Sequence, residues 1–408
     1  MKVSFRRLAY DVFFRFSPIL IVILLELALR FLGIGESYLL FNKSEDGLYY
    51  QLNPIYYRRF VSAKQFPDVN ILPQKIPIDK PENSYRIFII GDQTLCSSFS
   101  DANEKPLIED YTDEDGTYYD FVQLAVPFTN SFAVKRLLKN SVKYEADACV
   151  VVTGGNEYYG IPRKSDWLQD IENYWGLNFY VSMKNHRFIQ VLERFVYIKK
   201  ENQNVFPPEN IDDWIIPYDS QVFWEPVNYF QRNLFKISQK SECPIFLVSM
   251  PVNIVATPYR SLFVDKELKD EDFARECAVL VDNADRFTIE RWINDLEAWE
   301  PGTSIYYYCR AVIAEKEGKY EEALNNYNMA LETDAFRVRI NQEIYNIMLE
   351  ISREQNIELI DLLNHMNTIS DNGLDIDKYF IDGIHLNQRG KEIVLNRIRA
   401  SLESFFNP

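Results

Sequence analysis

Short apolar runs alternate with amphipathic stretches along most of the chain. Each run is rich in β-branched residues and is bounded by turn residues. Runs of this kind are typical of parallel strands that helices cover on both faces. The predicted strands are 86–90, 121–126, 148–153, 244–249 and 357–362, and the predicted helices are 131–143, 185–199, 227–240, 338–354 and 388–404. The pattern therefore predicts an α/β domain.

Three segments of this predicted domain are candidates for a functional site. In open α/β sheets, ligands bind beyond the carboxyl ends of the strands. The segments in that position are "GDQT" (91–94), "TGGNE" (153–157) and the turns that follow "PIFLVS" (244–249). We expect their side chains to meet at one edge of the sheet.

The N-terminal region has a different pattern, because Phe16 to Ile34 is nearly unbroken apolar sequence. A helix of this length, at ~1.5 Å per residue, matches the roughly 30 Å hydrocarbon core of a membrane. Glu26 and Arg30 interrupt it, but they are spaced to form an ion pair on one helix face. Basic residues precede the run and acidic residues follow it, which predicts a cytoplasmic N-terminus. We expect a retained transmembrane anchor over residues 1–35; a cleaved signal peptide or a core helix is the alternative.

Two further segments flank or interrupt the α/β pattern. Residues 36–84 are polar, aromatic and dotted with prolines, so we expect an extended juxtamembrane arm. Residues 266–335 are helical, and small and aromatic residues recur there as in a tetratricopeptide (TPR) helix pair, namely Gly318, Tyr320, Ala323, Tyr327 and Ala330. An ordinary amphipathic hairpin is the alternative. The α/β domain then comprises residues 85–265 and 336–408.

Composition argues against nucleic-acid binding and against a metal or cofactor site. The 408 residues carry a net charge of −16 and show no basic stripe, which argues against nucleic-acid binding. The five cysteines form no CxxC motif and no Cys/His cluster, so we expect neither a metal nor another cofactor. Their apolar surroundings favour buried free thiols, although a disulfide between some pair remains open outside the cytoplasm.

Acid–base chemistry points to one histidine. The chain has three histidines, and only His385 has an acid at a suggestive spacing, Asp382 in "DGIHLNQRG". A D-x-x-H turn ahead of a helix can place the carboxylate against the imidazole. Such a pair also arises by chance on protein surfaces.

Taken together, "RIFIIGDQT", "VVVTGGNEYYG" and "DGIHLNQRG" resemble the first, third and fifth blocks of the SGNH/GDSL hydrolase superfamily. The chain is similar, over nearly its full length, to membrane-anchored bacterial SGNH-type proteins with an embedded TPR segment. The resemblance implies a three-layer, flavodoxin-like parallel sheet. It also implies a location at the inner (cytoplasmic) membrane, with the main domain in the periplasm.

The resemblance also implies roles for individual residues. His385 would be the base and Asp382 its partner. Asn156 would donate its side-chain amide to an oxyanion, and Ala125 would donate its backbone N–H, although the family has glycine at the latter position. The family's serine nucleophile is replaced by Gln93, whose amide is a very poor nucleophile.

The substitution at position 93 leads to two functional hypotheses. The first is a non-catalytic binding or structural subunit of an envelope assembly, which contacts a protein partner through the TPR-like insertion. The second is an active esterase or acyl-transfer enzyme that acts on acylated glycans or lipids with Asp382 and His385. Aromatic segments at 173–181 and 212–230 could stack on sugar rings or simply pack onto the domain.

Overall fold

The computed structural model describes most of the chain. The described residues are 5–60, 74–91, 108–125, 130–159, 174–197, 215–218, 220–240, 242–262, 274, 275, 277, 279, 283, 286–299 and 302–407. Structural statements below concern these residues.

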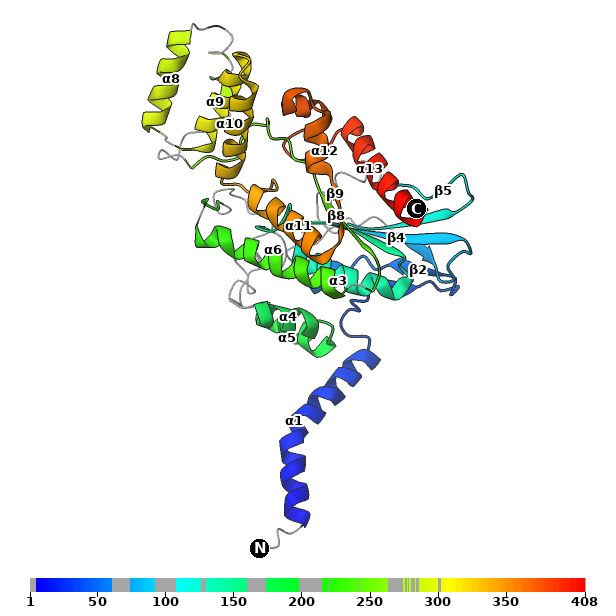
Figure 1. The fold of residues 1–408 in the computed structure, drawn as a ribbon. Helices are drawn as coiled ribbons and strands as arrows, with labels where there is room; N and C mark the ends of the chain where they lie inside the picture. Colours follow the sequence, from blue (N-terminus) through cyan, green and yellow to red (C-terminus); the bar gives the residue numbers. More distant parts are fainter. Residues whose placement is uncertain are drawn as a thin grey trace.

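The centre of the fold is a six-stranded sheet in the order β5-β6-β4-β7-β8-β9 (Figure 1). All neighbouring strands are parallel except β5, which pairs antiparallel with β6 at one edge. The α/β prediction is confirmed, and each predicted strand lies within three residues of an observed one. The strands are β4 (Ser84–Gly91), β5 (Tyr111–Thr112), β6 (Tyr118–Ala125), β7 (Ala148–Val152), β8 (Ile245–Ser249) and β9 (Glu358–Asp361).

Helices cover the sheet on both sides, with α3, α6 and α11 in one layer and α12 and α13 in the other (Figure 1). Every residue of β7 is buried, because the helical layers exclude water from both of its faces. Three asparagines cap α3, α11 and α13 by accepting a hydrogen bond from the first turn. The helices are α3 (Ser131–Ser141), α6 (Gln221–Lys240), α11 (Gln342–Gln355), α12 (Leu362–Ile369) and α13 (Gln388–Phe406).

Two helix starts differ from the prediction by four residues or more. Helix α11 begins at Gln342 rather than at 338, because the Asn341 side chain caps it by accepting from the Ile344 N–H. Helix α6 begins at Gln221 rather than at 227 and continues through Pro226. Burial of Phe223 in the main core accompanies this N-terminal extension.

Part of the segment for which we expect an extended arm is folded. It forms a small antiparallel sheet of β1 (Phe41–Lys43), β2 (Tyr49–Leu52) and β3 (Lys75–Pro77). A short 3₁₀ helix, Tyr56–Arg59, follows β2. Tyr56 and Phe60 are buried in the same core as the main sheet. Burial of these large aromatic rings therefore ties the segment to the α/β domain.

The segment 266–335 includes helices α8 (Arg286–Trp299), α9 (Ser304–Lys316) and α10 (Tyr320–Thr333). Figure 1 shows them at the end of the molecule farthest from the N-terminus. Ala311 and Ala314 of α9 pack with Ala323 and Tyr327 of α10. Small side chains at this contact allow the two helices to approach closely.

The N-terminal helix α1 (Phe5–Phe31) includes most of the predicted anchor. Among the described residues, however, no helix combines the length and the apolar composition needed to cross a membrane. The predicted ion pair between Glu26 and Arg30 is present, since the Arg30 Nε donates to Glu26 Oε1 at 2.7 Å. The other Glu26 oxygen accepts from the Phe188 N–H at the start of α5 (Arg187–Tyr197). Helix α1 is thus joined to the α4 (Tyr174–Met183) and α5 region.

Candidate functional site

The strand register brings the ends of three strands together. Gly91 at the end of β4 lies opposite both Ala125 of β6 and Val152 of β7. Gln93 follows Gly91 by two positions in the sequence but lies outside the described residues. For Ala125, the structure describes the backbone position at the end of β6. The segments predicted to form the site therefore start from adjacent strands at the carboxyl edge of the sheet.

Asp382 and His385 are joined in the loop before α13. The His385 Nδ1 lies 2.6 Å from Asp382 Oδ2, and Asp382 Oδ1 accepts from the backbone N–H groups of Ile384 and His385. Partial burial acts to raise the pKa of Asp382, but the hydrogen bonds from His385 and these N–H groups outweigh it and lower that pKa. The loop thus holds an ionised carboxylate against Nδ1 of the imidazole.

The loop that carries Asp382 and His385, here called the dyad loop, contacts residues that follow β8. The Asn253 N–H donates to the Gly383 carbonyl at 3.0 Å, and the Asn253 side-chain amide donates to the Asp382 carbonyl at 3.3 Å. The Tyr259 hydroxyl packs against Gly383, where it would lie 2.6 Å from an added Cβ, and its pKa is raised to about 12 by burial and by the Asp382 charge. The sequence marks the turns after β8 as part of the site, but it does not single out Asn253 or Tyr259.

Asn156 lies in a turn directly after β7. Gly154 in this turn has a φ of +112°, and a Cβ there would lie 3.0 Å from Ile344 of α11, so both backbone and packing favour glycine. The neighbouring Glu157 carboxylate accepts from the Ser131 N–H and hydroxyl at 2.8 and 2.7 Å and from the Thr153 hydroxyl at 3.0 Å. These bonds fix the turn against the start of α3.

The Asn156 side chain carries an amide, a group that can donate hydrogen bonds. The residue is 8% exposed, and within the described part of the chain no hydrogen bond involves its amide group. A fixed amide of this kind can stabilise negative charge that develops on a bound oxygen. Asn156 follows the central strand β7, and the loop of Asp382 and His385 is hydrogen-bonded to Asn253, which follows the neighbouring strand β8.

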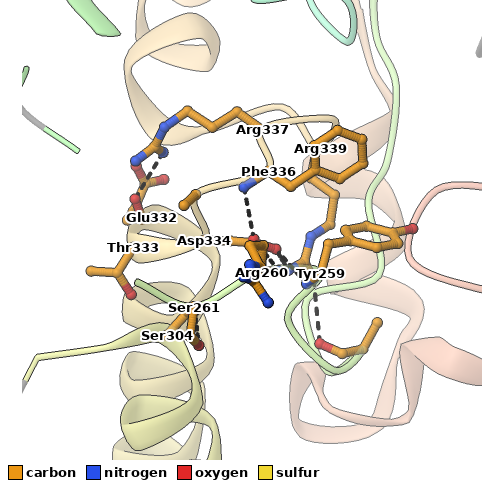
Figure 2. A network of polar contacts seen from close by, with 12 residues as sticks. Tyr259, Arg260, Ser261, Ser304, Glu332, Thr333, Asp334, Phe336, Arg337 and Arg339 are labelled. Atoms are coloured by element: carbon orange, nitrogen blue, oxygen red, sulfur yellow. Dashed lines mark hydrogen bonds and ion pairs between the residues drawn. The ribbon is translucent and has the colours of Figure 1, made fainter. Parts of the chain in front are cut away.

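A buried network of polar contacts surrounds Asp334 at the end of the helical segment (Figure 2). Asp334, just after α10, accepts from the backbone N–H groups of Tyr259 and Arg260 at 2.9 and 3.0 Å and from Arg339 Nη2 at 2.7 Å. Arg339 Nη1 in turn donates to the Asn253 carbonyl at 3.2 Å, and the guanidinium lies 5.4 Å from the centre of the Tyr259 ring. Asn253 and Tyr259 thus touch both the network and the dyad loop.

Several acidic residues precede β6 in the described range 108–117, but they form no metal site. Asp110 accepts from the Phe121 N–H and the Tyr118 hydroxyl, both at 2.8 Å, so it supports the edge of the sheet. No group of three or more His, Cys, Asp and Glu side chains in the described ranges could hold a metal ion.

Comparison with known proteins gives a likeness of fold. No protein-family model and no curated protein matches the chain. Among solved structures, it is similar to a lipase/acylhydrolase from Enterococcus faecalis, at 12% identity over 78% of this chain and 96% of that chain, with a TM-score of 0.33. It is also similar to an acetyl xylan esterase, AlAXEase, at 11% identity over 78% of this chain and 98% of that chain, with a TM-score of 0.31. A GDSL-like lipase from Bacteroides thetaiotaomicron has 9% identity, coverage of 78% and 88%, and a TM-score of 0.29.

Proposed function

We propose that this chain is an SGNH-hydrolase-like protein that binds an acylated ligand without cleaving it. The observation that carries the proposal is Gln93 in the sequence, two positions beyond Gly91 at the carboxyl end of the central strand β4. This is where the family resemblance calls for a serine. A carboxamide has no ionisable proton to lose at accessible pH and cannot replace a hydroxyl as the attacking group.

The remaining groups suit binding. His385 can exchange a hydrogen bond with a ligand through Nε2, because Nδ1 is occupied by Asp382. The Asn156 amide can donate to a carbonyl oxygen. A ligand with an ester or an acyl carbonyl offers the acceptor that this arrangement needs. Acylated envelope glycans and lipids are the ligand class that the family resemblance suggests.

The second candidate function is an active esterase or acyl-transfer enzyme. The observation that favours it is the intact hydrogen bond of 2.6 Å between His385 and Asp382, which is the geometry a general base requires. Asp92 could assist attack by water. Turnover would then depend on a nucleophile other than residue 93.

Ester hydrolysis distinguishes the two candidates. We expect the unaltered protein to leave short-chain aryl esters intact, and we expect Gln93→Ser to restore turnover because the base and the oxyanion donors remain. Gln93→Ser/His385→Ala is the matched control and should again be inactive. Turnover by the unaltered protein that disappears in His385→Ala would overturn the proposal and support the enzyme.

We also propose that α1 attaches the protein to the inner membrane, with the main domain outside the cytoplasm. Large apolar side chains are exposed along this helix, among them Ile21 at 63%, Leu24 at 56% and Leu27 at 57%. Contact with lipid would remove this surface from water. Alkaline extraction of membranes tests the idea: the full chain should stay in the membrane pellet, and its release into the supernatant would contradict attachment.

The α9–α10 pair is proposed to contact a protein partner. Tyr320 and Met329 on α10 are 45% and 42% exposed, and paired helices of this kind commonly present a binding surface. A photo-crosslinking residue in place of Tyr320 should capture a second protein in cells, and the captured protein should also bind the purified chain. Absence of any adduct would argue against this surface.

A further inference from the structure

Two cysteines face each other across strands β7 and β8. Cys149 is the second residue of β7, and Cys243 lies two positions before β8. The Cys149 N–H donates to the Pro244 carbonyl at 2.9 Å, which aligns the two segments side by side. Their sulfur atoms are 3.1 Å apart, and both thiols are reduced in this structure.

We propose that Cys149 and Cys243 form a reversible disulfide that joins β7 to β8. The sulfurs of a disulfide are about 2.05 Å apart, so the two atoms need to approach by only about 1 Å. Small rotations of the two side chains can supply this movement, because the hydrogen bond between Cys149 and Pro244 already holds the backbones together.

The two thiols differ in access. Cys149 is fully buried, whereas Cys243 is partly exposed and lines a cavity of about 490 Å³ together with Ser238, Gln355 and Asn356. The hydrogen bond to Cys243 and burial raise the pKa of the Cys149 thiol. Cys243 is therefore the thiol that meets an external oxidant first, and Cys149 completes the bond.

The oxidant is a disulfide compound, such as glutathione disulfide or the oxidised form of a dithiol oxidoreductase. The Cys243 thiolate attacks one sulfur of this compound, which forms a mixed disulfide and releases one thiolate. The Cys149 thiolate then attacks the Cys243 sulfur and releases the second thiolate. The two protons lost by the cysteines pass to the two released thiolates, and two electrons move from the protein to the oxidant.

The bond would lie at the end of the sheet opposite the candidate site. Cys149 and Cys243 are at the amino ends of β7 and β8, while the Asn156 turn and Asn253 follow the carboxyl ends of the same strands. The cross-link joins residues 94 positions apart and would restrict the unfolded chain considerably. It would stabilise the domain without altering the groups that face a ligand.

Peptide mapping tests the proposal on the full chain purified in mild detergent. The protein is equilibrated with glutathione disulfide, denatured, alkylated at its free thiols and digested. We expect one linked peptide pair containing Cys149 and Cys243, which disappears on reduction with dithiothreitol, while Cys277 and Cys309 are alkylated. Alkylation of all the cysteines after oxidation, or linkage of Cys243 to a different cysteine, would overturn the proposal.

Thermal unfolding supplies the second measurement. Oxidation should raise the Tm of the unaltered protein by roughly 5 °C, since closing a long loop stabilises the folded state. Cys243→Ala removes the accessible partner, and the oxidant should leave its Tm unchanged. Cys277→Ala is the matched control, because it removes a cysteine buried in the helical segment, and it should retain the shift. Equal shifts in the unaltered protein and Cys243→Ala would contradict this assignment.

Discussion

Two aspartates near the carboxyl edge of the sheet each pair with a nitrogen-containing side chain, Asp334 with Arg339 and Asp382 with His385, but their surroundings differ. The side chains of Asp334 and Arg339 are 3% and 2% exposed, and backbone N–H groups occupy the remaining acceptor positions of the carboxylate. The side chains of Asp382 and His385 are 43% and 34% exposed. The first pair is enclosed by protein, and the second is open to a ligand.

This difference determines how much of each pair a ligand could reach. A buried ion pair whose carboxylate has all its acceptor positions occupied holds two segments together but leaves that carboxylate no capacity for a ligand. In the exposed pair the carboxylate orients one edge of the imidazole and leaves the other edge accessible. Asn253 and Tyr259 link the two pairs, so the enclosed pair supports the loop that carries the open one.

The largest expected effect comes from the enclosed pair. Asp334→Asn leaves the Arg339 guanidinium buried without a counter-charge, and we expect the free energy of unfolding to fall by about 3–5 kcal/mol. Urea denaturation of the full chain measures this change. Asp375→Asn is the matched control, since it removes an aspartate whose partner, Lys378, is partly exposed. Equal losses in the two variants would contradict the contrast between enclosed and open pairs.

A smaller effect is expected at the link between the pairs. Tyr259→Phe removes the hydroxyl that packs against Gly383, while the ring can still pack against Arg339. We expect a loss of about 1 kcal/mol in the free energy of unfolding. The amide NMR resonances of Gly383 and His385 should shift, and that of Arg86 at the opposite end of the sheet should not. Unchanged resonances in the loop would show that Tyr259 does not support it.

The smallest effect concerns the exposed pair and depends on pH. The pKa of Asp382 is lowered in the folded state, so its ionised form stabilises the protein above pH ~4, and this contribution is lost as the pH falls through the folded pKa. Near pH 5, the free energy of unfolding of the unaltered protein should exceed that of Asp382→Asn by less than about 1 kcal/mol, because solvent screens the pair. Urea denaturation at about pH 3 should show a smaller difference. The same difference in free energy of unfolding at both pH values would contradict the lowered pKa of Asp382.

The sequence predicted the four central strands of the sheet well because they are buried on both faces. Runs such as "ACVVV" have no polar alternation and are rich in β-branched residues, as is typical of central strands that helices cover on both faces. The pairing of Asp382 with His385 was also predictable, since they lie three positions apart in one turn. These features depend on local sequence.

Features that depend on contacts between distant segments were not predictable in the same way. Asp334 appears in the sequence as one acid among many, and its role arises only when the chain brings it to residues 259 and 260. Tyr56 and Phe60 likewise belong to a segment without periodicity, yet they are buried against the main sheet. Sequence periodicity has no means of reporting such long-range packing.

A covalent probe tests the central claim, that the base and the oxyanion donors remain while the nucleophile is missing. Fluorophosphonates form a stable adduct with an activated serine, and intact mass measurement detects the added group. We expect no adduct on the unaltered protein and one adduct at position 93 in Gln93→Ser, which should be lost in Gln93→Ser/His385→Ala. An adduct on the unaltered protein that requires His385 would show that another residue acts as the nucleophile.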